Sequence, residues 1–139
     1  MLRQLNAMQT KQNLLTRSIP NIDKTFGKLD IFIDNAGICT EQIFGKENSS
    51  SVTLKDLQQT FQTNLFSVVK LTQKMLPLIK KSPAGQVVNL SSILASLTLH
   101  SMRNSPIDPA KAFAYNASKT VVNEYTIHLR MNSVTPISK

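Results

Sequence analysis

The pattern of apolar and polar positions predicts two strands separated by one long helix. Residues 29–35 carry apolar side chains on both faces, which is typical of a strand buried in a parallel sheet. Residues 86–90 form a second short apolar run. Between the two runs, apolar residues recur at steps of three and four along one helical stripe: Leu54, Leu57, Phe61, Leu65, Val68, Leu71 and Met75. This order predicts two parallel strands joined by a helical crossover.

The long helix carries three informative residues. Ser51 or Thr53 is expected to cap its start. Pro77 is expected to kink or end it, although Leu78 and Ile79 could extend the apolar pattern. Asn64 lies on the apolar stripe, where a buried amide must have its hydrogen bonds satisfied. Two explanations stay open. Asn64 either satisfies a kinked backbone or orders a water, or it is a tolerated polar residue at the edge of the stripe.

Weaker patterns flank this unit. A short strand is expected over residues 13–16, followed by a short helix over residues 18–26 that Gly27 would stop. Residues 97–107 are polar and irregular, which predicts a loop. These segments connect the main elements and carry no chemistry by themselves.

A second long helix is expected near the carboxyl end. Asp108 can act as its cap and Pro109 as its first residue, and the helix would run to about Leu129. Apolar residues on more than one side of this helix predict burial on both sides, which would fit a homo-oligomer.

The same helix carries the candidate chemistry. Tyr115 and Lys119 are four residues apart, so a helix places them on one face, one turn from each other. A cation beside a phenol favours the ionised phenol, which suits proton exchange with an alcohol. Taken alone the pair is weak evidence, because a half-buried tyrosine beside a solvated lysine is common.

Small and polar residues follow each predicted strand. Asn35, Ala36 and Gly37 end the first strand, and Ser91 and Ser92 end the second. Parallel strands gather their ligands at the carboxyl edge of the sheet, so these residues could face a ligand. Each group could equally be an ordinary turn.

Composition narrows the class of protein. The 139 residues allow one domain, and 41% hydrophobic residues indicate a globular chain. The net charge of +8 could attract a phosphorylated cofactor, nucleic acid or a membrane, but the lysines are scattered and no aromatic residues interleave with them, which argues against a nucleic-acid partner. Cys39 is the only cysteine, no metal-ligand spacing occurs, and no apolar run suits a signal peptide or a membrane span. The chain is predicted to be cytoplasmic.

Together these motifs resemble the short-chain dehydrogenase/reductase family, specifically its carbonyl-reductase-like members. Residues 26–38 are similar to the family's fourth strand with its Asn-Ala-Gly motif. Asn64, Ser92, Tyr115 and Lys119 match its catalytic tetrad in the family's order. The resemblance implies an α/β fold with an incomplete Rossmann-like, doubly wound parallel sheet, in a single partial domain over residues 1–139.

The resemblance also implies a role for each member of the tetrad. Tyr115 would be the general acid in reduction and the base in oxidation. Lys119 would make Tyr115 more acidic and bind the nicotinamide ribose. Ser92 would hold the carbonyl or hydroxyl of a small-molecule substrate, and Asn64 would anchor a water in a proton relay.

The implied cofactor is a nicotinamide dinucleotide, with NADP(H) favoured over NAD(H). Asn35, Ala36 and Gly37 would line its adenosine side. If residues 14–17 are the second strand, Arg17 would be placed to bind a 2′-phosphate, and Pro136 would follow a sixth strand near the nicotinamide.

Two departures from the family pattern leave the activity open. Ser92 and Tyr115 are 115 − 92 = 23 residues apart, longer than the usual gap, which predicts an inserted loop beside the substrate. None of the four glycines lies in a Gly-rich turn after a first strand, so the phosphate-binding loop is absent from this chain. The chain is therefore interpreted as an NAD(P)(H)-dependent oxidoreductase or, alternatively, as a catalytically silent truncated remnant that binds or dimerises.

Overall fold

The computed structural model describes residues 17–131, with side chains up to residue 129. The chain divides into two compact units. Unit one comprises Met1–Ala36 and Phe66–Leu90, and unit two comprises Gly37–Leu65 and Ser91–Lys139.

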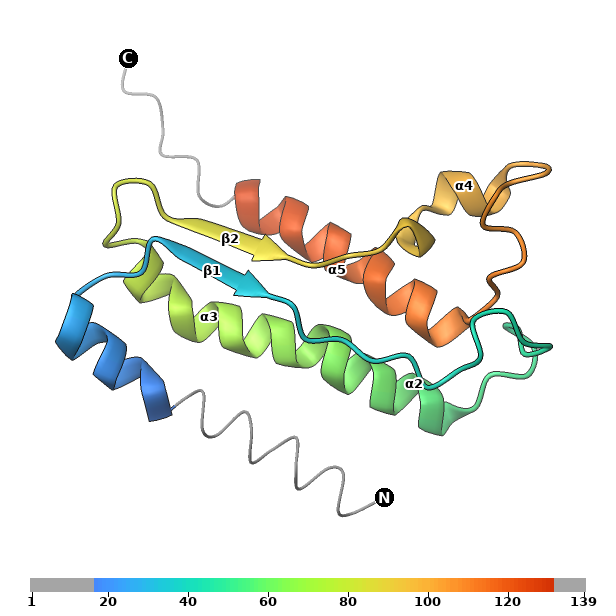
Figure 1. Cartoon of the computed structure of the whole chain (residues 1–139), viewed down its shortest axis with the longest axis horizontal. Helices are drawn as coiled ribbons and strands as arrows, with labels where there is room; N and C mark the ends of the chain where they lie inside the picture. Colours follow the sequence, from blue (N-terminus) through green and yellow to red (C-terminus); the bar gives the residue numbers. More distant parts are fainter. Residues whose placement is uncertain (1–16, 132–139) are drawn as a thin grey trace. The chain divides into compact units, whose positions relative to one another are not determined.

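Unit one is built on two parallel strands. β1 (Ile31–Asp34) pairs with β2 (Gln86–Asn89), with Ile31 opposite Gln86 and Asp34 opposite Asn89. The helix α3 (Ser67–Ile79) runs along this pair (Figure 1). The predicted parallel pairing is therefore confirmed, and both strands are shorter than their apolar runs.

The helix α3 passes through Pro77 and ends at Ile79, so Pro77 does not end it, and the alternative that Leu78 and Ile79 extend the helix is confirmed. Proline removes one helical hydrogen bond. Leu78 and Ile79 are 3% and 5% exposed, so continuing the helix buries two large apolar side chains and offsets that loss. The carbonyl of Leu78 also accepts a hydrogen bond from Leu29 N at 3.1 Å.

The predicted helix over residues 18–26 is confirmed within a helix that the structure describes from residue 17. Gly27 ends it in the left-handed conformation, with φ of +69°, and its N–H donates to Asp23 O at 2.8 Å. The predicted strand over residues 13–16 lies outside the described residues. Arg17 itself is helical and exposed, so the proposed strand over residues 14–17 is wrong at Arg17.

Gly85 lies where the chain approaches the end of α3 before entering β2. A Cβ atom at this position would be 2.3 Å from Ile79 O and 2.7 Å from Ile79 Cγ2. We expect Gly85→Ala to lower the free energy of unfolding by about 1–3 kcal/mol, because backbone must move to relieve the clash. Urea unfolding measures the loss. Ala84→Ser, at the exposed neighbouring residue, is the control, and equal stability of the two variants would contradict the close approach.

Unit two begins with a capped helix. α2 (Leu54–Phe61) has Thr53, one of the two predicted caps, as its N-cap, and the Thr53 hydroxyl accepts from Asp56 N at 3.1 Å. The same hydroxyl donates to the Asp56 carboxylate, which lowers the pKa of Asp56. A π-helical segment, η1 (Gln62–Phe66), follows directly and carries Asn64. The sequence boundary between the units falls within η1.

The carboxyl-terminal half of unit two holds a short 3-10 turn, η2 (Ile93–Ala95), a short helix, α4 (Leu97–Ser101), and the long helix α5 (Phe113–Met131). The expected loop over residues 97–107 therefore begins with α4. The Ser96 hydroxyl caps α4 by accepting from Leu99 N at 3.2 Å.

The start of α5 differs from the prediction, because Asp108 and Pro109 lie in turns and the helix begins at Phe113. Asp108 N donates to Ser105 O at 3.0 Å, and the Asp108 carboxylate pairs with the Lys111 ammonium at 2.6 Å. The backbone N–H and the carboxylate of Asp108 thus both bond to residues before α5, so Asp108 does not cap that helix.

Candidate active site

Tyr115 and Lys119 lie one turn apart on α5, as predicted. Lys119 is only 4% exposed, and Tyr115 is half-buried. A Cβ atom added to Gly37 would be 3.2 Å from Lys119 Nζ and 3.7 Å from Asn64 Oδ1. The backbone of Gly37, the Lys119 ammonium and the Asn64 amide are therefore neighbours, and a side chain at position 37 would crowd the ammonium.

Asn64 is fully buried and joins three segments. Its Oδ1 accepts from Ile38 N at 2.8 Å, and its Nδ2 donates to Ile38 O at 2.8 Å and to Ser118 Oγ at 3.0 Å. Ser118 Oγ in turn donates to Tyr115 O at 2.8 Å. The Asn64 amide thus satisfies backbone groups, which favours the first of the two explanations given above. The backbone it satisfies belongs to the segment after Gly37, however, and not to a kinked helix.

Ser92 caps the η2 turn, because its hydroxyl accepts from Leu94 N at 3.2 Å. Two hydrogen bonds attach this turn to α5. Ser91 Oγ donates to Lys119 O at 3.4 Å, and Thr120 Oγ1 donates to Ala95 O at 3.1 Å. The segment that carries Ser92 is therefore held against the part of α5 that carries Lys119.

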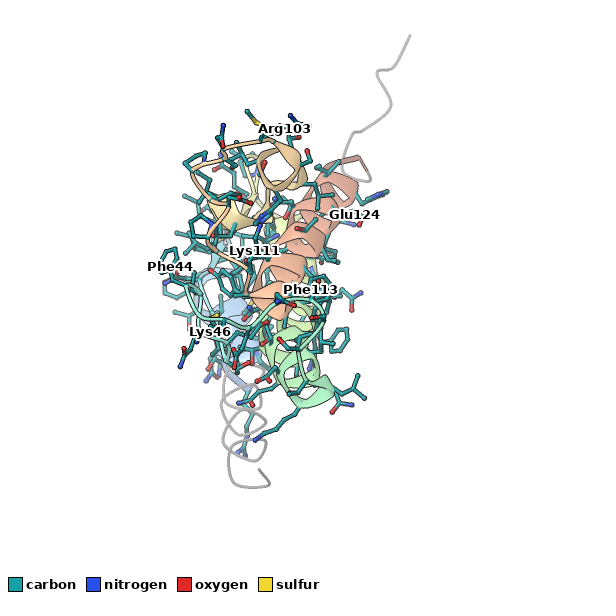
Figure 2. All side chains as sticks on the ribbon, turned by 90° about the vertical axis from the view of Figure 1, so that its right-hand side faces the viewer. Phe44, Lys46, Arg103, Lys111, Phe113 and Glu124 are labelled. Carbon is teal, nitrogen blue, oxygen red and sulfur yellow. The ribbon has the colours of Figure 1, made fainter. Side chains whose placement is uncertain are left out.

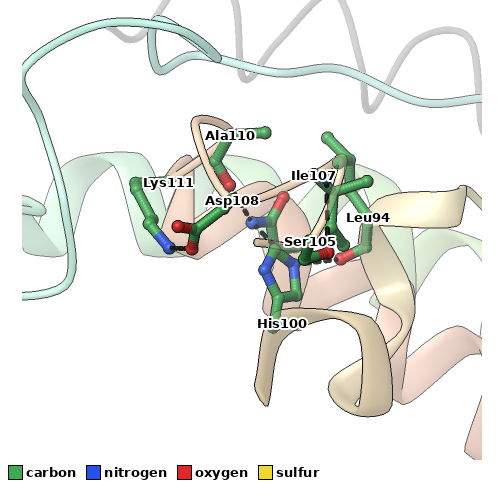
Figure 3. Close-up of polar contacts among 8 residues, drawn as sticks. Leu94, His100, Ser105, Ile107, Asp108, Ala110 and Lys111 are labelled. Atoms are coloured by element: carbon green, nitrogen blue, oxygen red, sulfur yellow. Dashed lines mark hydrogen bonds and ion pairs between the residues drawn. The ribbon is translucent and has the colours of Figure 1, made fainter. Parts of the chain in front are cut away.

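The loop between α4 and α5 is fixed by side chains that sequence analysis did not single out (Figure 3). His100 Nε2 is 3.0 Å from Leu94 O, and Asn116 Nδ2 donates to Ala110 O at 3.0 Å. A carbonyl can only accept, so His100 carries a proton on Nε2 when this bond is made. Asn116 Nδ2, 3.3 Å from the same nitrogen, then directs its hydrogen to Ala110.

Glu41 is the second group that the sequence pattern missed. Its carboxylate accepts a hydrogen bond from Tyr115 N at 2.9 Å, although the two residues are 74 positions apart. Only the folded chain reveals such a pair.

Cys39 lies two residues before Glu41, and burial raises the pKa of the Cys39 thiol.

The structure adds little about the other four residues that were predicted to bind the cofactor. Asn35 and Ala36 belong to unit one, are exposed, and follow β1 in a turn in which Ala36 N donates to Asp34 Oδ1 at 3.2 Å. Arg17 is exposed, and Pro136 lies outside the described residues. The binding roles of these four residues stay predictions.

Exposed side chains of unit two include both signs of charge and two phenylalanines. Among them are Phe44, Lys46, Arg103, Lys111, Phe113 and Glu124 (Figure 2). Among the described residues, no cluster of three or more His, Cys, Asp or Glu side chains could hold a metal ion. Within residues 17–131, no helix combines the length and the apolar character needed to cross a membrane.

Comparison with known proteins identifies the family. Residues 5–136 match the family model described as short chain dehydrogenase. A short-chain dehydrogenase/reductase of Aspergillus fumigatus is 28% identical over 127 residues, covering 88% of this chain and 45% of that protein. Mouse carbonyl reductase [NADPH] 1 is 30% identical over 116 residues, covering 84% of this chain and 37% of that protein.

Solved structures agree. A putative short chain dehydrogenase from Escherichia coli, complexed with NADPH, matches with a TM-score of 0.67 and 26% identity, covering 87% of this chain and 45% of that one. A yeast short chain dehydrogenase/reductase matches with a TM-score of 0.66 and 26% identity, covering 88% and 42%. The fold is thus that of a Rossmann-like α/β protein. The chain belongs to the short-chain dehydrogenase family, and it spans less than half the length of these relatives.

Proposed function

We propose that this chain supplies the catalytic part of an NADP(H)-dependent oxidoreductase that interconverts a small carbonyl compound and its alcohol. The observation that carries the proposal is the buried Lys119 ammonium, which lies beside the bare Cα of Gly37 and one helical turn from Tyr115. A buried ionisable side chain one helical turn from another ionisable group is typical of a functional site.

The residues present fit a nicotinamide ribose. Gly37 leaves space next to Lys119 Nζ that a Cβ atom would narrow, and an ammonium is a suitable donor to ribose hydroxyls. We propose that Lys119 and Gly37 hold this part of the cofactor. The bound cofactor would supply the hydride donor or acceptor.

The protein's own groups would manage the proton. We propose that Tyr115 donates a proton to the substrate oxygen in reduction and removes it in oxidation, because its half-buried phenol lies one helical turn from the Lys119 ammonium. Ser92 would orient the substrate oxygen by a hydrogen bond, and the attachment of its turn to α5 keeps that hydroxyl in a fixed segment. Asn64 would keep the segment after Gly37 in place.

The preference for NADP(H) rests on two relatives. One similar structure was solved with NADPH, and the name of the mouse relative specifies NADPH. A small carbonyl or alcohol as substrate is likewise proposed from the name of the mouse carbonyl reductase.

A turnover assay tests the proposal. The purified chain is mixed with NADPH deuterated at the transferred position and with a panel of small ketones and aldehydes. We expect loss of the reduced-nicotinamide absorbance and an alcohol that carries deuterium on the former carbonyl carbon. Binding of NADPH without any deuterium transfer would contradict the proposal and favour the alternative, a catalytically silent binding or dimerising module.

A further inference from the structure

The helix that carries Tyr115 and Lys119 has no cap from its own sequence. The first N–H groups of a helix have no partner within it and are usually satisfied by a side chain just before its start. α5 begins at Phe113, and the residue before it is Ala112, which is fully buried and has no side-chain acceptor. The N–H of Tyr115, in the first turn, therefore needs an acceptor from elsewhere.

Glu41 supplies that acceptor from a distant segment. Its side chain is buried, with the residue only 8% exposed, and its Oε2 accepts from Tyr115 N at 2.9 Å. Its Oε1 is buried and has no hydrogen-bond partner among the described residues. Burying a carboxylate in this way is costly, but the positive end of the α5 dipole offsets part of the cost.

The segment that presents Glu41 is itself fixed. Both backbone groups of Ile38 bond to the Asn64 amide, and the Thr40 hydroxyl lies 3.2 Å from that of Thr60 on α2. The Cys39 thiol donates to Glu41 O at 3.3 Å. Residues 38–41 therefore connect Gly37, beside the Lys119 ammonium, to the backbone of Tyr115.

We propose that Glu41 is a positioning residue that fixes the first turn of α5 and so holds the phenol of Tyr115 in register with Lys119. The consequence for turnover rests on the proposed function, since it assumes that Tyr115 is the acid/base. The positioning itself does not, and it can be measured in the absence of substrate.

The test uses two variants of similar size and one control. Glu41→Met removes the acceptor, Glu41→Gln keeps one, and Glu47→Gln removes an exposed carboxylate from the same loop. Amide hydrogen exchange followed by NMR reports the first turn through Tyr115 N–H and the centre of the helix through Val122 N–H. We expect Glu41→Met to speed exchange at Tyr115 by about 2- to 30-fold, the range expected for loss of a helix cap, with Val122 unchanged.

Glu41→Gln should restore most of the protection at Tyr115, and Glu47→Gln should resemble the unmodified chain. In the turnover assay, Glu41→Met should lower kcat more than it changes the KM for NADPH. Unchanged exchange at Tyr115 in Glu41→Met, or equal acceleration at Tyr115 and Val122, would overturn the proposal. If exchange changes as expected while Tyr115→Phe remains fully active, the proposed function fails and the positioning of α5 stands.

Discussion

Replacing Tyr115 with Phe is expected to lower turnover by about 10²- to 10⁴-fold, the usual contribution of a positioned general acid. The change removes one hydroxyl and leaves the ring, the helix and the backbone hydrogen bond to Glu41 in place. NADPH should therefore bind nearly as before, because Lys119 and Gly37 are untouched. Steady-state kinetics with a carbonyl substrate, together with a cofactor titration, separate the two effects.

Tyr125→Phe is the matched control for this experiment. Tyr125 lies on the same helix and is also half-buried, and the substitution removes the same atom. It should retain turnover close to that of the unmodified chain. An active Tyr115→Phe variant, or equal losses in both variants, would show that Tyr115 does not transfer the proton.

The largest effect on stability is expected at Asn64. Asn64→Leu would leave Ile38 N and Ile38 O without their partner and remove the hydrogen bond that Ser118 Oγ accepts, at a residue that has no exposure to solvent. Each buried polar group left unsatisfied costs about 1–3 kcal/mol, so we expect a loss of about 3–5 kcal/mol. That is a large share of the stability of a typical domain.

Urea unfolding measures this loss, and Asn123→Leu provides the comparison. Asn123 is exposed on α5, so the same substitution there should change stability by no more than about 0.5 kcal/mol. If Asn64→Leu and Asn123→Leu unfold at the same urea concentration, Asn64 does not hold the segment after Gly37.

Features set by local sequence were predictable. The two strands follow from compact apolar runs, and their parallel pairing follows from the helix between them. Thr53 is one of two hydroxyl residues, with Ser51, that precede the apolar helical stripe, and the structure shows that Thr53 is the cap. The shared face of Tyr115 and Lys119 needed only the period of a helix.

Features set by distant contacts were not predictable. The helix continues past Pro77 because burial of Leu78 and Ile79 outweighs the lost hydrogen bond, and a local rule for proline cannot weigh that burial. Asp108 has the chemistry of a cap but pairs with Lys111, while α5 takes its acceptor from Glu41, 74 residues earlier. Asn64 likewise finds its partner in Ile38, 26 residues away.

The central claim is that the buried ammonium of Lys119 forms part of a cofactor site. NADPH fluorescence titration of Lys119→Met tests it most directly. Lys111→Met is the control, because Lys111 is an exposed lysine just before α5. We predict saturable binding for the unmodified chain and for Lys111→Met. Lys119→Met should bind at least about 10-fold more weakly, which corresponds to about 1.4 kcal/mol. Equal affinity for NADPH in both variants would contradict the account.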